Sequence, residues 1–440
     1  MLNKLTKIKY FKTGTYFFLE IIFFPFFILF FILLILFKRK KNVFELPRLL
    51  WGVDPIISNK YWSESLKQKG YFSKTIMNGF YSSINKKEDF DIYIDEILPI
   101  KLPINITAYC VFLYSIYNFD IIHHPAHGFL LRFTYLLNRF EGTLIKLGGC
   151  KNIILPYGAD IWMYSRINNS ELRHALLLSY PNAAKNETKI KRRINYWINH
   201  CSIFFPILQI DGIGYWDLLC YSNWAIDEKS WLFNNNFSNE KNGKDKIVII
   251  LHSPNHRGVK GTEFIIKAVE DLKNEGLKVE LILLEKVSND FVKDIMNEAD
   301  ILIEQLVVAH GLSAVEGMAK GLTVISNFED EGRNKVFRTY SYLNECPIVS
   351  ASPENITSVL RQLVTNPELR EQLGKAGRAY VEKYHSYSYS QYLFGEIYKK
   401  IWNNQGVDLM NMFHPINPKS YNNSLPVIQH PLIKNKLASP

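Results

Sequence analysis

The sequence predicts an α/β protein in which an apolar N-terminal helix precedes two domains, each built on a parallel sheet. Between Lys246 and Asn327, three short apolar runs alternate with three helical patterns, and βα units of this kind form a parallel sheet. A second α/β series begins at Pro47, and an almost wholly apolar run, Tyr16 to Phe37, precedes both. The length of 440 residues is enough for two domains with separate cores.

The apolar run Tyr16–Phe37 is long enough to cross a bilayer, since about 1.5 Å per residue gives it a reach of roughly 33 Å. No small-residue cleavage site follows it, as a signal peptide would require. Basic residues flank the run on both sides, so the positive-inside rule does not decide its orientation in the membrane. The charged Glu20 would be costly to place in the hydrocarbon core of the membrane, and Pro25 can kink the helix. A re-entrant hairpin therefore remains an alternative to a single span. In either case we expect segment 1–41 to anchor the protein to a membrane.

The first domain is expected over residues 42–240. Its strands are expected at Leu49–Gly52, Phe72–Met77, Phe119–His124, Asn152–Leu155 and within Cys201–Pro206, and its helices near Lys60–Lys69 and over Phe129–Leu147. The polar stretch Asn234–Asp245 reads as the linker to the second domain.

The second domain is expected over residues 241–403. After its three βα units, the pattern predicts a strand at Pro347–Ser350 and helices near 354–364, 368–383 and 387–402. Residues 404–440 contain several prolines and little periodicity, which predicts an extended or disordered tail.

The net charge of +10 is concentrated at the N-terminus. Residues 1–41 hold eight Lys and Arg against one acid, so this segment carries +7 and the remaining chain only +3. The basic excess therefore indicates anionic lipid rather than nucleic acid as a partner. The five cysteines are scattered without metal-ligand spacing, which fits a reducing compartment and predicts no metal site.

A loop after the first strand of the second domain predicts phosphate binding. Arg257 and Lys260 stand there just before a helix, where cations and free backbone N–H groups favour a phosphate. Glu316 lies near the start of a later helix on a small, apolar face, where ribose hydroxyls would give its carboxylate a partner. A solvated basic loop and an exposed acid in a first helical turn are the alternatives. Together the three side chains indicate a site for a nucleotide diphosphate.

These residues resemble the C-terminal domain of GT-B glycosyltransferases, in particular the retaining group 1 (family 4) type with its Arg and Lys phosphate clamp and its E-x7-E motif. By this resemblance Arg257 and Lys260 form the clamp and Glu316 is the second acid of the motif, while Val308 stands at the position of the first acid. The resemblance implies two Rossmann-like domains that face each other across a cleft. It also implies that the fixed cations take the place of a divalent metal beside the leaving diphosphate.

The remaining candidates lie at expected strand ends or in adjacent turns. For donor binding they are Gly52, His252, Ser253, Glu285 and Gly311. For catalysis, His127 and Asp160 of the first domain join Arg257 and Lys260. Structural roles stay open for four of them: a plain turn at Gly52, a satisfied strand end at His252, a loop histidine at His127 and a helix cap at Asp160.

The expected function is a membrane-attached glycosyltransferase with cytoplasmic catalytic domains, where nucleotide sugars are made. It would transfer a sugar, with retention, from a nucleotide diphosphate-sugar to a glycan or lipid-linked acceptor, with no cofactor besides this donor. Val308 and Tyr157 depart from residues that the family commonly carries, so a catalytically degenerate scaffold of the same fold is one alternative. A sugar-nucleotide epimerase of related fold is the other.

Overall fold

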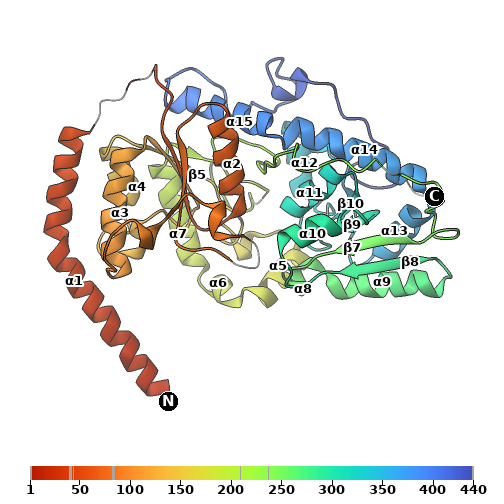
Figure 1. Cartoon of the computed structure of the whole chain (residues 1–440), viewed down its shortest axis with the longest axis horizontal. Helices are drawn as coiled ribbons and strands as arrows, with labels where there is room; N and C mark the ends of the chain where they lie inside the picture. The colour runs from red at the N-terminus through yellow and green to blue at the C-terminus, as the bar shows by residue number, and fades with distance from the viewer. Residues whose placement is uncertain are drawn as a thin grey trace.

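The computed structural model describes residues 2–38, 42, 44–81, 85–208, 210–235 and 237–438, with side chains from residue 14 onward. These residues form two parallel sheets that stand side by side with helices on their faces (Figure 1). The strands are short and apolar, and most are buried along their whole length, as expected for parallel sheets that helices cover on both faces. The prediction of an α/β chain with two sheets is confirmed.

The first sheet has the strand order β3-β2-β1-β4-β5-β6. Its strands are β1 (Leu49–Val53), β2 (Ser73–Met77), β3 (Ile92–Tyr93), β4 (Ile121–His124), β5 (Lys151–Ile154) and β6 (Ile203–Phe204). Its helices are α2 (Ile57–Gln68), α3 (Ile104–Asn118), α4 (Glu141–Leu147), α5 (Ser170–Ser179), α6 (Pro181–Lys185) and α7 (Glu187–His200). The strand order reverses between β1 and β4, because the chain adds β2 and β3 on one side of β1 before it continues on the other.

The second sheet has the order β11-β10-β9-β7-β8 and reverses between β7 and β9. Its strands are β7 (Val248–His252), β8 (Val279–Leu283), β9 (Ile301–Ile303), β10 (Thr323–Ser326) and β11 (Val349–Ser350). The helices of this half are α8 (Arg257–Lys260), α9 (Thr262–Asn274), α10 (Asn289–Ile295), α11 (Leu312–Lys320), α12 (Glu331–Tyr340), α13 (Ile356–Thr365), α14 (Pro367–Tyr384) and α15 (Tyr387–Ile401).

Helix α15 leaves the second half of the chain and packs on the first sheet. The rings of Phe394 and Trp51 lie with centroids 5.0 Å apart, and Tyr398 Oη lies 2.9 Å from His123 Nε2. Both contacts are buried, so they fix the two halves against each other. The last helix of the second half therefore returns over the first sheet.

Residues 205–247 connect the two sheets, and their described part contains neither helix nor strand. The connection is packed, since Phe205, Tyr221 and Trp231 are buried in the core. It begins well before the linker expected at Asn234–Asp245. The division of the chain into domains 42–240 and 241–403 falls within this connection and stays a prediction.

The helix predicted over Phe129–Leu147 is wrong for most of its length. The structure has a short 3-10 turn at Leu131–Phe133 and then only α4. The carboxylate of Glu141 accepts hydrogen bonds from the backbone N–H groups of Phe129 and Leu131. Because a side chain takes these N–H groups, the loop satisfies its backbone without an α-helix.

The tail after residue 403 has irregular backbone, as predicted, but residues 404–438 are packed rather than disordered. Phe413 is buried against Tyr342, with ring centroids 5.2 Å apart. The ammonium of Lys383 donates hydrogen bonds to the carbonyl oxygens of Asn422 and Pro426. Buried apolar side chains and these polar contacts give the tail enough contact with the second domain to order it.

Helix α1 (Leu2–Phe37) continues through Pro25, so residues 2–37 contain no re-entrant hairpin. By length and composition its stretch Gly14–Phe37 could cross a membrane. This stretch lies along α3, on the outside of the first half of the molecule (Figure 1). The basic residues Arg39, Lys40 and Lys41 that were expected to flank it lie outside the described residues.

Candidate active site

Polar side chains gather where each sheet reverses its strand order. In the first sheet, β1 leads into Asp54 and β4 into the loop of His127. In the second, β7 leads into Ser253 and β9 into Glu304. The crevice outside the carboxyl ends of the strands at such a reversal point is the usual ligand site of an open parallel sheet. The molecule therefore has two such edges, one from each sheet.

A cavity of about 480 Å³ lies at the reversal point of the second sheet. Its lining includes Ser253, Lys260, Glu304, Gly311 and Glu316 from the second half of the chain and Ile57 from α2 of the first. The cavity thus lies between the two halves. It brings together four of the predicted site residues: Ser253, Lys260, Gly311 and Glu316.

Lys260 stands at the end of α8 and points toward β9. Its ammonium pairs with the carboxylate of Glu304, whose side chain is only 1% exposed. The same carboxylate accepts hydrogen bonds from Gly311 N at 3.3 Å and Ser313 Oγ at 3.1 Å. Glu304 therefore anchors both Lys260 and the turn that precedes α11. Gly261, which follows Lys260, has φ +73°, a left-handed conformation that favours glycine and lets the chain turn from α8 into α9.

Arg257 does not line the cavity. Its guanidinium donates to Glu263 at 2.8 Å and pairs with Glu285 at 2.9 Å, and the side chain is 39% exposed. Glu285, a predicted donor-binding residue, is thereby occupied with Arg257, whereas the adjacent Lys286 lines the cavity. Both residues of the predicted clamp are neutralised by carboxylates in this structure. A diphosphate would have to replace these carboxylates as their partner.

Glu316 is buried in the first half of α11, among small apolar residues. Burial raises the pKa of its carboxyl to about 7, and a hydrogen bond from Asn289 and the charge of Lys293 offset only part of the effect. A carboxyl group that is this poorly solvated and lines a cavity gains strongly from a ligand that donates hydrogen bonds to it. The alternative of an exposed acid in the first turn is wrong.

A second polar cluster lies at the reversal point of the first sheet. The carboxylate of Asp54 pairs with the guanidinium of Arg132 and accepts a hydrogen bond from Tyr157 Oη at 3.3 Å. Tyr157 Oη is also 2.8 Å from Nδ1 of His127, whose side chain is 32% exposed. Burial raises the pKa of Asp54, but hydrogen bonds from His127 and Arg132 more than offset this and hold the pKa below its ordinary value. The cluster is an ionised carboxylate that orients a partly exposed histidine.

Asp160 lies beneath this cluster and is fully buried. Its carboxylate accepts hydrogen bonds from the backbone N–H groups of Ala126 at 2.8 Å, Tyr157 at 3.0 Å and Gly158 at 3.0 Å. Burial raises the pKa of Asp160, and these N–H groups counter the rise. The bonds join the loop after β4 to the loop after β5, so Asp160 holds the segments that carry His127 and Tyr157.

Comparison with solved structures identifies the fold. An alpha-glucosyltransferase in complex with UDP and a 13-mer DNA aligns with a TM-score of 0.51 at 9% sequence identity, covering 80% of this chain and 99% of that one. The chain has the GT-B fold. A glycosyltransferase from Rickettsia africae aligns at 14% identity with a TM-score of 0.45, covering 81% and 99% of the two chains. Anabaena Alr3699/HepE in complex with UDP-glucose aligns at 8% identity with a TM-score of 0.47, covering 80% and 99%. No protein-family model and no curated protein matches the sequence.

Within the GT-B fold, two of the predicted donor-binding residues have structural partners. His252 is fully buried, with Nδ1 2.7 Å from Ile303 O and Nε2 2.9 Å from Thr262 Oγ1. It joins β7 to β9 and to the start of α9, the strand-end role that the sequence left open. At Gly52, a Cβ would lie 1.9 Å from the carbonyl oxygen of Ile76, so glycine is needed there for the approach of β2. Neither residue lines the cavity.

Sequence reasoning missed Asp54 and Arg132. Asp54 had a usable signal, because it is an acid directly after a buried strand of a parallel sheet. Arg132 had none, since its partner is 78 positions away in the sequence. Val308, at the position of the missing motif acid, packs with apolar residues of the first half, whereas Glu304 brings a carboxylate to the turn before α11.

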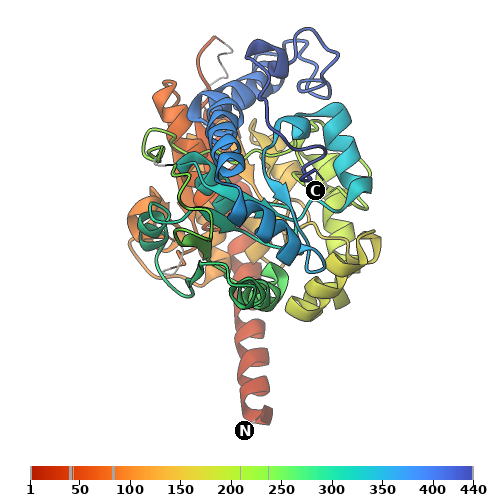
Figure 2. The same ribbon diagram turned by 90° about the vertical axis from the view of Figure 1, so that its right-hand side faces the viewer.

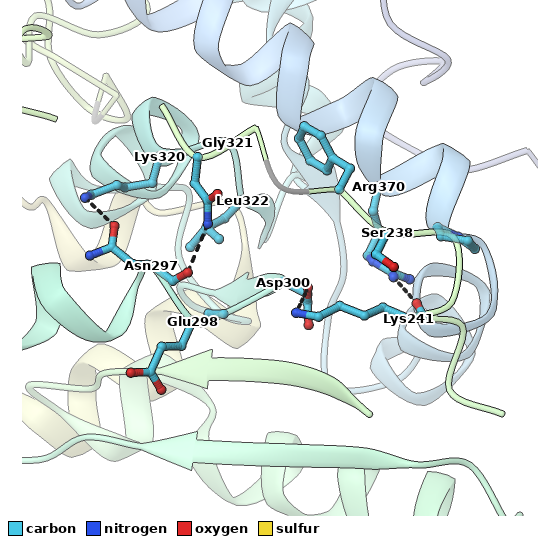
Figure 3. Close-up of a pocket in the computed structure, with 13 residues that line it drawn as sticks. Ser238, Lys241, Asn297, Glu298, Asp300, Lys320, Gly321, Leu322 and Arg370 are labelled. Carbon is cyan, nitrogen blue, oxygen red and sulfur yellow. Dashed lines mark hydrogen bonds and ion pairs between the residues drawn. The ribbon is translucent and has the colours of Figure 1, made fainter. Parts of the chain in front are cut away.

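A further cavity of about 280 Å³ lies at the opposite edge of the second sheet, where β9 and β10 begin (Figure 3). Two of its lysines have partners within the protein: Lys241 pairs with Asp300 at 2.8 Å, and Lys320 donates a hydrogen bond to Asn297 at 2.7 Å. Arg370 donates to the carbonyl oxygens of Val364 and Lys241. These bonds hold the connection between the sheets against the second sheet. Among the described residues, no group of three or more His, Cys, Asp or Glu side chains is placed to hold a metal ion.

Proposed function

We propose that the protein is a membrane-associated glycosyltransferase that takes a sugar from a nucleotide diphosphate-sugar and passes it, with retention, to a glycan or lipid-linked acceptor. One observation carries this proposal: a single cavity between the two halves holds the ammonium of Lys260 and the buried carboxyl of Glu316. A cation and a hydrogen-bond acceptor at one reversal point match the two ends of a ribose diphosphate. UDP is the nucleotide to test first, because the solved alpha-glucosyltransferase of the same fold holds UDP.

Donor binding would exchange partners within the site. The β-phosphate takes the ammonium of Lys260 from Glu304, and the ribose hydroxyls donate hydrogen bonds to Glu316. As the bond between sugar and diphosphate breaks, charge builds on the departing oxygen, and the fixed cation stabilises that charge. No protein carboxylate is required as a nucleophile in this scheme. The protein contributes mainly by positioning the two substrates.

The Asp54, His127 and Tyr157 cluster is the proposed acceptor side. Its ionised Asp54 holds His127 through Tyr157 and directly, with Asp54 Oδ2 3.7 Å from His127 Nδ1. A histidine held in this way, with its side chain partly exposed, can orient an acceptor hydroxyl or receive its proton. The chain continues from Asp54 into α2, whose Ile57 lines the donor cavity, so the two sides of the site are neighbours.

Calorimetry with UDP, UMP and uridine tests the donor site on the full chain. We expect saturable binding of UDP and at least tenfold weaker binding of UMP, because UMP lacks the phosphate that Lys260 would bind. Hydrolysis of UDP-sugars in the absence of acceptor, monitored by the release of UDP, then identifies the donor. Failure of every nucleoside diphosphate to bind would overturn the proposal.

The pairing of Lys260 and Arg257 with carboxylates favours one second candidate, a non-catalytic scaffold with this fold. In such a protein the ion pairs would be permanent and the cavity would have no anionic ligand. The calorimetric experiment separates the two, since a scaffold of this kind gives no heat with any nucleoside diphosphate.

A further inference from the structure

The apolar N-terminal helix contacts the body of the protein along one narrow stripe. Phe27 and Phe31 are buried against α3, where the ring of Phe27 lies 4.6 Å from that of Tyr109 and the ring of Phe31 lies 6.5 Å from that of Phe112. Glu20 is buried on the same stripe. Spacings of seven and four residues between these three positions keep them on one face of a helix.

Glu20 is the only charged residue in the run Tyr16–Phe37, and it points at the protein. Its carboxylate accepts hydrogen bonds from Tyr109 Oη at 2.7 Å and from the backbone N–H groups of Tyr135 at 3.0 Å and Leu136 at 2.8 Å. Asn105 Nδ2 lies 3.2 Å away. A buried carboxylate with this many donors is stable only while the helix stays in contact with α3 and the loop beside it.

The other end of the apolar run is fixed by Lys38. Its ammonium donates to Gly148 O at 2.9 Å and lies 3.0 Å from Cys150 Sγ. Polar contacts thus hold α1 to the body at both ends of an 18-residue stretch, which is about 27 Å of helix. The docked part of α1 is therefore the apolar part.

The opposite face of this stretch is apolar and uncovered. Only 17% of the residues in an 18-residue window of this helix are buried, and Phe18 and Leu36, near the two ends of the apolar run, are 61% and 71% exposed. Leu29 lies between them on the same line of the helix and is also exposed. An apolar surface that runs the length of such a helix marks a contact with a membrane or another protein.

Charge identifies the occupant as lipid. The sequence places Lys4, Lys7, Lys9 and Lys12 before the apolar run, and Arg39, Lys40 and Lys41 after the docked Lys38. A basic segment at each end of an apolar helix is attracted by anionic headgroups, whereas the same segments on a second copy of this chain would repel it.

We infer that α1 lies in the plane of the membrane surface, with its outer face submerged and its inner face still docked on α3. Residues 2–13 project beyond the body (Figures 1 and 2), and their sequence is basic, so the free end of the helix is not suited to insertion. A crossing orientation would instead require the apolar stretch to leave α3 and expose Glu20 to hydrocarbon.

This arrangement fixes the orientation of the enzyme. Helix α1, then α3 and α4, then the first sheet follow one another in layers, and the second sheet lies farthest from α1 (Figure 1). The proposed acceptor half is then adjacent to the bilayer and the donor half faces the aqueous side. The inference rests on the proposed membrane association and deepens it, because a lipid-linked acceptor would reach the first domain directly.

Depth measurements on full-length protein test the inference. Nitroxide labels are placed singly by Phe18→Cys, Leu29→Cys and Leu36→Cys, in a background where the partly exposed Cys110 and Cys201 are exchanged for serine. The protein is bound to vesicles of phosphatidylcholine with phosphatidylglycerol, and label depth is read from the accessibility of each nitroxide to oxygen and to a polar relaxation agent. We expect all three labels at the same shallow depth, and flotation that weakens at least tenfold without phosphatidylglycerol.

A label at Leu29 that lies about 10 Å deeper than the labels at Phe18 and Leu36 would show a span and overturn the inference, because the two ends of a spanning helix lie near opposite surfaces and its middle lies in the hydrocarbon. No flotation on either vesicle, with self-association in sedimentation, would overturn it in favour of a second copy. The triple variant Phe18→Ser, Leu29→Ser, Leu36→Ser is expected to lose flotation and to keep its affinity for UDP. Because UDP binding is measured separately, its absence would count against the glycosyltransferase proposal and leave the membrane result unaffected.

Discussion

Replacement of Lys260, the lysine of the proposed phosphate clamp, is expected to have two separable effects, one on stability and one on nucleotide binding. Lys260 neutralises Glu304, whose side chain is 1% exposed, so the variant Lys260→Met leaves a buried carboxylate without its cation. Such a loss costs about 3–5 kcal/mol in general. Hydrogen bonds from Gly311 N, Ser313 Oγ and Ser326 Oγ remain, which places our expectation at about 3 kcal/mol.

The double variant Lys260→Met, Glu304→Gln removes the buried charge together with its partner. We expect it to recover all but about 1 kcal/mol of the loss, because the amide of Gln is neutral and still accepts hydrogen bonds. In thermal unfolding monitored by circular dichroism, we expect the melting temperature of the single variant to lie about 6–12 °C below that of the wild type for a domain of this size. The melting temperature of the double variant should fall by much less.

Nucleotide binding should stay weak in the double variant although its thermal stability recovers. A charge-assisted bond from Lys260 to a phosphate contributes about 1.5–3 kcal/mol, so both variants should bind UDP about 10- to 100-fold more weakly in calorimetry. Wild-type affinity in the double variant would refute the phosphate role of Lys260. Equal loss of thermal stability in the single and double variants would refute the argument that Glu304 is held by this ion pair.

Three further predictions concern other residues of the site. Because burial raises the pKa of Glu316 to about 7 from an ordinary value of 4.5, the folded protein keeps a proton that the unfolded chain has lost, and stability falls as pH rises through this window. The free energy of unfolding of Glu316→Gln, measured in urea, should therefore rise by about 3 kcal/mol relative to that of the wild type between about pH 5 and pH 8. Parallel pH profiles of unfolding free energy for the two proteins would contradict this. His127→Asn should lower the transfer rate by about 10²–10⁴-fold and leave calorimetric UDP binding unchanged; an unaltered rate would remove the histidine from the mechanism. Asp160→Ala should destabilise the protein by about 3 kcal/mol, since it leaves two buried backbone N–H groups and a partly buried one without an acceptor, and an unchanged unfolding midpoint would show that these bonds are dispensable.

Much of the second half could be predicted from the sequence. The apolar runs that became β7, β9 and β10 are short, and each leads directly into a polar turn. Because carboxyl ends of parallel strands meet at one edge of a sheet, Lys260 and Glu316 could be expected at one site, and they line one cavity. That conclusion needed only local pattern and a general rule about sheets.

Other parts of the site could not be predicted, because their partners are distant in the sequence. Glu304 meets Lys260 across 44 positions, and Asp54 meets Arg132 across 78. The helix expected over Phe129–Leu147 failed for the same reason, since a carboxylate 10 to 12 positions away takes the backbone N–H groups of its first turn. Periodicity reports which face of a segment is apolar and carries no information on such pairings.

The sequence by itself determined the kinds of element, their order along the chain and the apolar character of the N-terminal helix, because these depend on neighbouring residues and on spacings within a few turns. Only the tertiary structure decided which charges are neutralised, which carboxyls are buried and which face of α1 is covered. Glu20 is an example: the sequence marks it as costly in a membrane, and its donors, 85 to 116 positions away, turn it inward. Burial and charge pairing are properties of segments brought together by folding, so they follow from the packing of the whole chain.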